Sequence, residues 1–325
     1  GSGNLDHHNI QMFTMTVMGL GIVWPSRPYV AGTIAGIAAA FSLAIGLETL
    51  LFVVGAGFTV LLRTVIVGTP STRKLLIAFC LALGISGTLF WLGQAPPATR
   101  MIPICDQLGT PLLSVIWTAV IATLVPLIIF RGASKPIAGL AITAGLTGLG
   151  IFLAWSLLVP CFAGPYAQLP QDLQNFISTR ITEAMPGLLF AQRRPEATIQ
   201  FVLPVFYTVA AGILYFMSNR GNGDETQDRN TALAVLIGLC LVGIGMIFIQ
   251  IRTTIMAASI VPIVAGYLLA RQFDKYIATR DPVAALLGLI STLVIISPAV
   301  ISTAVKPLLP QNAGSALGDS ANCRT

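Results

Sequence analysis

Long apolar runs separated by short polar segments make up most of this chain. A helix needs about 20 apolar residues to cross the hydrocarbon core of a membrane. Runs of this kind predict ten transmembrane passes, at residues 10–24, 29–46, 49–67, 74–93, 111–130, 137–160, 200–217, 231–250, 253–270 and 283–304. Two pairs of passes form apolar stretches of about 40 residues, which as single helices would be about 60 Å long, twice the thickness of that core. We therefore expect the chain to turn back near Gly46-Leu47-Glu48 and near Gln250-Ile251-Arg252.

This pattern divides the chain into five parts. Residues 1–9 are predicted to be an external loop that carries Asp6-His7-His8, residues 10–160 a six-helix transmembrane segment, and residues 161–199 an external loop with an amphipathic helix. Residues 200–304 are predicted to form a four-helix transmembrane segment, and residues 305–325 a disordered tail with a polar end. The predicted fold is all-α, a polytopic transmembrane bundle of about ten helices.

The composition agrees with a membrane protein. Of 325 residues, 55% are hydrophobic and only 9% are charged, and the mean hydropathy is +0.85. A soluble domain needs roughly 25% charged residues, whereas lipid solvates the outer wall of a membrane protein. The net charge of +6 does not indicate nucleic-acid binding, because the Lys and Arg residues are scattered singly between apolar runs.

The basic residues also predict which loops face the cytoplasm, because cytoplasmic loops carry an excess of Lys and Arg. Counted over alternate loops, one set holds eleven: Arg27, Arg63, Arg73, Lys74, Arg131, Lys135, Arg220, Arg229, Arg271, Lys275 and Arg280. The other set holds seven: Arg100, Arg180, Arg193, Arg194, Arg252, Lys306 and Arg324. We therefore expect the first set inside and the second outside, with Asp6 and the loops 94–110 and 161–199 on the external side.

The five cysteines show no CxxC spacing and so do not indicate a zinc site. Cys80 and Cys240 lie inside apolar runs and are interpreted as core residues. Cys105 and Cys161 both fall on the external side, where an oxidising compartment would allow them to form a disulfide.

Three places have residues that could carry chemistry, and the first is the segment before the first pass. Asp6 lies within two residues of His7 and His8, the only histidines of the chain. A carboxylate and imidazoles so placed can hold a divalent cation, with imidazole suiting Mn or Zn better than Mg. The alternative is a solvated terminus or the remnant of a tag.

The second place is the long external loop. Pro170 to Met185 is predicted to be an amphipathic helix, because apolar residues recur at spacings of three and four. A helix lying flat on the bilayer is one interpretation. The other places Glu183 over an active site at the membrane surface.

The third place is Arg252, at the outer end of the eighth pass. An Arg at membrane depth costs from about 2.5 to more than 10 kcal/mol, so it usually snorkels or pairs. The functional alternative is a clamp on an anionic headgroup, since a planar guanidinium matches phosphate oxygens. Glu48 occupies the other tight outer turn and is interpreted first as a turn or cap residue.

Taken together, these sites resemble the catalytic subunit of oligosaccharyltransferase and its relatives in the GT-C superfamily of membrane glycosyltransferases. Gly3-Asn4-Leu5-Asp6-His7-His8 resembles the acidic motif of an external loop in that family, with His8 in the second acidic position. Thr179-Arg180-Ile181-Thr182-Glu183 is similar to its Ser/Thr-x-x-Glu motif, and Ile251-Arg252-Thr253-Thr254 is similar to its Arg two passes further on. The order of the motifs and the spacing in passes are also similar.

The resemblance implies transfer of a sugar or glycan from a polyprenyl-(di)phosphate donor to an acceptor. It implies Asp6 and Glu183 as catalytic residues and, with His8, as ligands of Mg or Mn, and Arg252 as the residue that holds the donor phosphate. Glu48 and Tyr166 are further candidates for substrate binding. It also implies three helices and an external Asp ahead of Gly1. No Trp-Trp-Asp motif of the kind that reads an acceptor peptide in that family is present, so the acceptor stays open.

The expected location is the bacterial inner (plasma) membrane, with the active site on the periplasmic side. The expected partners are a polyprenyl-linked sugar donor, an acceptor of unknown kind and membrane lipid, with no nucleic acid. A secondary transporter is one alternative, with Arg63 and several Gly-rich passes lining a pathway. A catalytically inactive membrane scaffold is the other.

Overall fold

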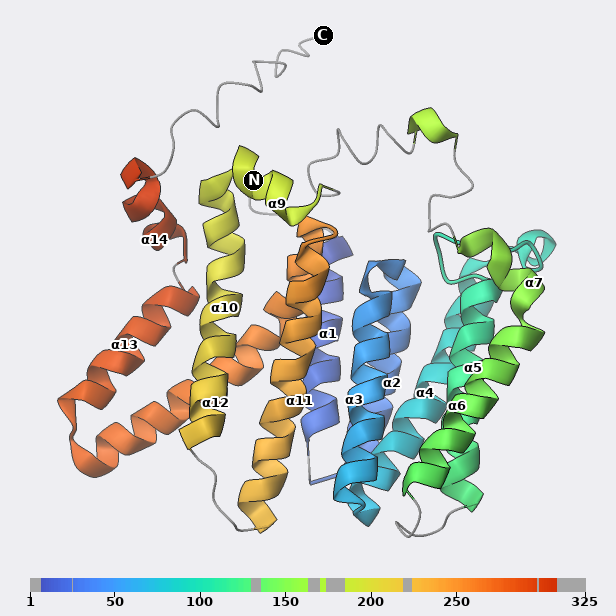
Figure 1. The fold of residues 1–325 in the computed structure, drawn as a ribbon, viewed down its shortest axis with the longest axis horizontal. Coiled ribbons are helices and arrows are strands. Elements are labelled where there is room, and N and C mark those ends of the chain that lie inside the picture. The colour runs from blue at the N-terminus through green and yellow to red at the C-terminus, as the bar shows by residue number, and fades with distance from the viewer. Residues whose placement is uncertain are drawn as a thin grey trace.

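A computed structural model describes residues 7–24, 26–129, 136–162, 170–173, 185–218, 224–296 and 298–308. Over these residues all regular elements are helices (Figure 1). In chain order they are α1 (His7–Val23), α2 (Pro28–Ile45), η1 (Leu47–Thr49), α3 (Leu50–Val67), α4 (Pro70–Gln94), η2 (Pro97–Thr99), α5 (Thr110–Ile129), α6 (Pro136–Leu153), α7 (Trp155–Leu158), η3 (Val159–Cys161), α9 (Gly187–Arg193), α10 (Pro195–Ser218), α11 (Asp224–Ile247), η5 (Ile251–Thr253), α12 (Thr254–Thr279), α13 (Pro282–Ile296), α14 (Pro298–Val305) and η6 (Lys306–Leu308).

The described helices confirm a polytopic all-α membrane protein. Seven are long and apolar enough to span a membrane: Pro28–Ile45, Leu47–Val67, Pro70–Gln94, Thr110–Ile129, Pro195–Ser218, Asn230–Ile247 and Thr254–Thr279. An eighth span results if Ile137–Leu153 and Trp155–Cys161, which meet at a bend of 69°, cross together. α1 has 17 residues and α13 has 15, which is short of the roughly 20 that a crossing needs. The described chain thus supports seven or eight spans, where ten passes were predicted.

The predicted turns at Gly46-Leu47-Glu48 and Gln250-Ile251-Arg252 are confirmed, because η1 and η5 separate successive antiparallel helices there. The predicted pass at 283–304 is wrong as one helix, since α13 ends at Ile296 and α14 begins at Pro298. Proline lacks the N–H that would continue the helix, and it disfavours the helical conformation of the residue before it. Proline is tolerated in the first turn of a helix, where its missing N–H would have no helical partner. This preference explains why α10 begins at Pro195, five residues before the predicted start at 200.

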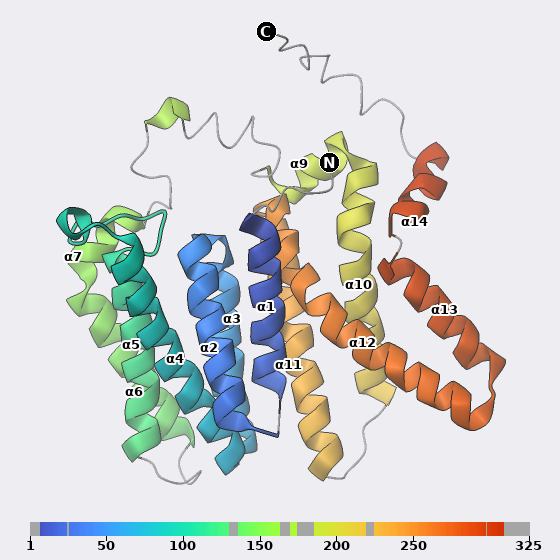
Figure 2. The ribbon, with the colours of Figure 1, turned by 180° about the vertical axis from the view of Figure 1, so that it is seen from behind.

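The helices stand in a curved row, with α1 near its centre (Figure 2). α1 packs against α2 on one side and α12 on the other, where the Thr16 hydroxyl donates to the Ser259 carbonyl at 2.8 Å. The closest pair of helices is α2 and α4. A Cβ on Gly36 would lie 2.5 Å from the Phe79 carbonyl oxygen, and Gly32 approaches the Leu75 carbonyl in the same way one turn earlier. These glycines let two membrane helices meet backbone to backbone, as small residues do in helix–helix contacts within lipid.

Two arginine side chains donate hydrogen bonds to carbonyls near the ends of neighbouring helices. Arg63, which is buried, donates from Nη1 to the Ile22 carbonyl at 2.9 Å, near the end of α1. Arg73 donates to the Leu127 carbonyl of α5 at 2.8 Å. Basic side chains commonly satisfy the last carbonyls of a helix in this way. This contact gives Arg63 a structural role, and the transport pathway considered from the sequence stays a prediction.

One end of the bundle holds η1, η3, α9 and η5, and we call it the outer end (Figure 1). Cys105 and Cys161 form a disulfide there, with their Cα atoms 5.2 Å apart, which confirms the predicted pair. Cys80 and Cys240 are free and buried, as predicted for core residues. Disulfides persist in oxidising compartments, and the sidedness of the membrane predicted from the basic residues stays a prediction.

Candidate functional site

A cavity of about 880 Å3 lies at the outer end of the bundle. We call it the outer cavity. Its walls come from the η1 turn, the loop before α5, the first turns of α5, η3, and the end of α11 with η5. Its polar lining residues are Glu48, Asp106, Gln107, Gln250 and Thr253. Its larger apolar lining residues are Ile45, Leu47, Leu50, Leu51, Ile104, Leu112, Val115, Leu158, Phe162, Met246 and Ile249. Polar groups in a mainly apolar cavity are typical of sites for small molecules and cofactors.

A polar network joins the start of α1 to the η1 turn. His8 Nδ1 lies 3.5 Å from a carboxylate oxygen of Glu48 and 3.4 Å from the side-chain oxygen of Gln11. Gln11, only 1% exposed, donates from Nε2 to the Gly46 carbonyl at 3.3 Å. The network therefore holds the residues that follow Asp6 against a wall of the outer cavity.

A second contact joins the end of the long external loop to η5. The Ile251 N–H donates to the Met185 carbonyl at 2.8 Å. Two residues later the chain passes so close to α11 that a Cβ on Gly187 would lie 2.5 Å from the Ile247 carbonyl oxygen. Phe190, Ile247 and Ile251 then form a small buried cluster. The loop that contains Glu183 thus ends beside the segment that contains Arg252.

The structure brings His8 and Glu48 together, but it does not describe every predicted site residue. Asp6, Tyr166 and Glu183 lie outside the described residues. Arg252 belongs to η5, and its side chain is likewise outside the description. The amphipathic helix expected at residues 170–185 falls mostly outside it as well, and stays a prediction.

Four polar residues of the cavity wall were not predicted as site residues. Asp106 and Gln107 follow Cys105 in the external loop, and Gln250 and Thr253 flank Arg252. A polar residue beside a cysteine on the external side was the available signal for the first two. Gln11 was missed too, although an amide inside an apolar helix is itself unusual.

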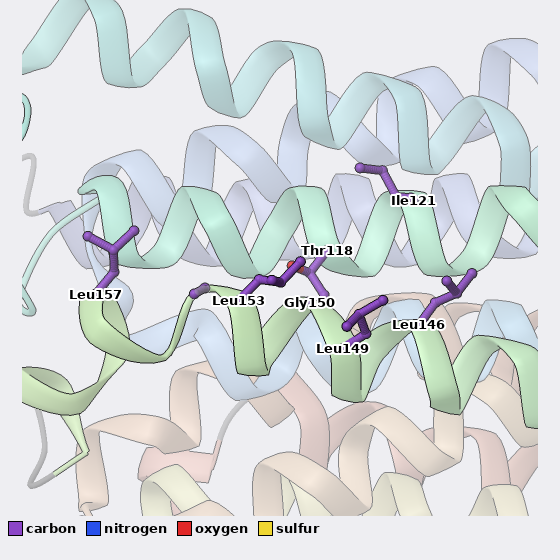
Figure 3. A pocket seen from close by; sticks show the side chains of 8 residues that line it. Thr118, Ile121, Leu146, Leu149, Gly150, Leu153 and Leu157 are labelled. Atoms are coloured by element: carbon purple, nitrogen blue, oxygen red, sulfur yellow. The ribbon is translucent and has the colours of Figure 1, made fainter.

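An apolar groove of about 400 Å3 lies along α5, α6 and α7 (Figure 3). Its lining residues are Thr118, Ile121, Leu146, Leu149, Gly150, Leu153, Ala154 and Leu157. The groove and the outer cavity are both lined by residues of α5, because Val115 lines the cavity and Thr118, one turn further along the helix, lines the groove. In α7, Leu157 lines the groove and Leu158 lines the cavity.

The residues that the structure describes contain no group of three or more His, Cys, Asp or Glu that could hold a metal ion. Of the predicted metal ligands, His8 is described and lies beside Glu48, whereas Asp6 and Glu183 lie outside the described residues, so the metal site stays a prediction. No protein-family model, no curated protein and no solved structure matches the chain. Its fold defines it as an integral membrane protein with several helical spans.

Proposed function

We propose that this protein is a membrane glycosyltransferase of the GT-C type. It transfers a sugar or glycan from a polyprenyl-(di)phosphate donor to an acceptor at the external face of the membrane, with the help of a divalent metal ion.

One observation carries this proposal: the described neighbours of the three predicted site segments meet around a single cavity. His8, two residues after Asp6, contacts Glu48 in the cavity wall. Met185, two residues after Glu183, is hydrogen-bonded to Ile251, which lies between the cavity residues Gln250 and Thr253. The segments that contain Asp6, Glu183 and Arg252 are far apart in the sequence. A shared function at the outer end of the bundle would explain why their neighbours lie close together.

The contact between His8 and Glu48 suits a metal site. A histidine that binds a metal usually donates its other ring N–H to a carboxylate, which fixes the tautomer and the orientation of the ring. With Nδ1 directed toward Glu48, His8 would bind through Nε2, and Glu48 would position it. The carboxylates of Asp6 and Glu183 are the oxygen ligands that Mg or Mn favours. A bound cation would stabilise the negative charge on the departing phosphate.

The shape of the outer end suits an amphipathic donor. The polar residues of the cavity lie at the outer end of the bundle, where the donor headgroup would lie, and Arg252 stands in the sequence between Gln250 and Thr253, two of them. A guanidinium there would bind the donor phosphate through paired hydrogen bonds. The apolar groove beside the cavity offers the polyprenyl chain a track along α5 and α6.

The experiment is sugar transfer by the purified protein in liposomes, with a polyprenyl-diphosphate sugar as donor. Asp6→Ala and Glu183→Gln should each abolish metal-dependent consumption of the donor and leave membrane insertion intact. Glu196→Gln is the matched control, because Glu196 is an outer carboxylate paired with Lys306 at 3.4 Å and does not line the cavity. Unchanged turnover in both test variants would reject the assigned roles.

A secondary transporter is favoured by one feature, the bend of 69° between α6 and α7, since transporters use broken helices near their substrates. A transporter would move solute across sealed liposomes and leave the sugar–phosphate bond of the donor uncleaved. The same liposomes therefore distinguish the two functions.

A further inference from the structure

The loop between α4 and α5 presents two polar side chains to the outer cavity. Asp106 and Gln107 are exposed and line the cavity, whereas Cys105 and Leu108 on either side are 8% and 3% exposed. No hydrogen-bond partner of either side chain is found within the described part of the chain. A carboxylate and an amide with unused hydrogen-bonding capacity therefore face the space in which the donor headgroup would lie.

The rest of the loop holds Asp106 and Gln107 in their position at the cavity. The disulfide ties Cys105 to Cys161 at the end of η3. The Gly109 N–H donates to the Gln107 carbonyl at 2.7 Å, and a Cβ on Gly109 would lie 2.8 Å from the Ile104 carbonyl oxygen, so the two sides of the loop are in close contact. The disulfide thus holds the loop to η3 at Cys105, and the close approach of Gly109 to Ile104 holds its backbone together before α5.

The start of the loop is anchored as well. Arg100 donates from Nε to the Ala95 carbonyl and from Nη2 to the Leu92 carbonyl, both at 3.0 Å. Its guanidinium also lies 5.9 Å from the ring centre of Trp91. The Thr110 hydroxyl donates to the Arg100 carbonyl. A loop held at so many points loses little conformational entropy when it binds a ligand.

We propose that Asp106 and Gln107 recognise the sugar of the donor, and that the Cys105–Cys161 disulfide positions them. This inference rests on the proposed function and names the part of its site that selects the glycan. A sugar hydroxyl both donates and accepts hydrogen bonds, so a carboxylate acceptor and an amide with both capacities are complementary to adjacent hydroxyls. Gln250 and Thr253 also line this cavity.

The test compares donors with and without sugar, using the full chain in liposomes. Donors are polyprenyl diphosphates that carry single hexoses or N-acetylhexosamines, and polyprenyl diphosphate without sugar serves as a competitive inhibitor. Asp106→Asn and Gln107→Leu should each raise KM for the sugar-bearing donor about tenfold, as expected for a lost hydrogen bond to a charged or polar group. The inhibition constant of the sugar-free carrier and kcat should stay within about twofold, which is within the noise of such comparisons.

Asp274→Asn is the matched control, because Asp274 is an exposed carboxylate of α12, near its inner end and away from the cavity. A merely structural role of the loop would change the inhibition constant of the sugar-free carrier and the thermal stability together with KM. That result, or an unchanged KM in both variants, would overturn the inference and leave the proposed function standing.

The role of the disulfide is tested on the assembled protein. Dithiothreitol added to the unsubstituted enzyme should raise KM for the sugar-bearing donor as the Asp106 variant does, and should have no further effect on the double variant Cys105→Ser/Cys161→Ser. An unchanged KM after verified reduction would overturn this part. Failure of the unsubstituted protein to bind or use any sugar donor would instead overturn the proposed function, and the inference with it.

Discussion

Replacing Gly187 by alanine perturbs the junction between the long external loop and η5 without touching a proposed site residue. The added Cβ would lie 2.5 Å from the Ile247 carbonyl oxygen, whereas ordinary contact begins at 3.4 Å, so the two backbones must separate by about 0.9 Å. Neither partner is the flexible end of a side chain, so a rotamer change cannot relieve the overlap. The hydrogen bond between Met185 and Ile251 is the adjacent contact and would be stretched.

The consequence for activity follows from this displacement. A misplacement of about 1 Å can cost about 10²-fold in rate when it disturbs the geometry of reacting groups. Overpacking of this kind costs about 1–3 kcal/mol of stability. We therefore expect Gly187→Ala to lower kcat for sugar transfer by about 10- to 100-fold, while the protein remains folded at 25 °C with a lower melting temperature.

The matched control is Gly245→Ala in the adjoining helix α11. A Cβ on Gly245 meets nothing within 4 Å, and glycine costs a helix about 0.5–1 kcal/mol relative to alanine, so this variant should keep or gain stability. Both variants are assayed for kcat in liposomes and for melting temperature in detergent. Equal kcat values for the two would refute the argument that the junction at Gly187 positions the Glu183 loop.

Three further predictions follow from other contacts. Glu48→Gln should weaken the apparent affinity for the activating metal about 10- to 100-fold, because Glu48 would no longer orient His8; activity titrated against Mn²⁺ checks this, and an unshifted titration contradicts it. Leu149→Trp should fill part of the groove and raise KM for long-chain polyprenyl donors more than for short-chain analogues; an equal effect on both would remove the groove from donor binding. Gly36→Leu should destabilise the bundle by at least about 1–3 kcal/mol because α2 and α4 touch there, and thermal unfolding alongside Gly238→Leu, a position with open space, measures the difference.

The pattern of apolar residues predicted most of the helices and the turns between them, because a segment that lies in lipid or in the protein core must be apolar along its length. The turns at Glu48 and Arg252 followed from length alone, since an apolar run of about 40 residues cannot cross the membrane once. The break at Pro298 and the early start at Pro195 were missed because they depend on the backbone chemistry of single residues within otherwise apolar or loop-like stretches.

The candidate site was less predictable, because its contacts join distant segments. The pairing of His8 with Glu48 depends on how α1 packs beside the α2–α3 turn, and hydropathy does not encode which helices are neighbours. The hydrogen bond between Met185 and Ile251 is likewise a tertiary contact between backbones, and no side-chain pattern marks it. The predicted disulfide needed only two cysteines on one side of the membrane, and so it was accessible from the sequence.

The placement of polar groups also bears on the class of substrate. Of the described residues, Arg63 is the charged one that is buried, and it donates to a carbonyl near the end of α1. A solute crossing the membrane would need polar groups along its path, whereas here the polar groups of a mainly apolar cavity lie at one end and a separate apolar groove lies along α5, α6 and α7. The proposed donor has a polar head and a long apolar chain, and with the head in the cavity and the chain in the groove each part would keep the environment that it has in the bilayer.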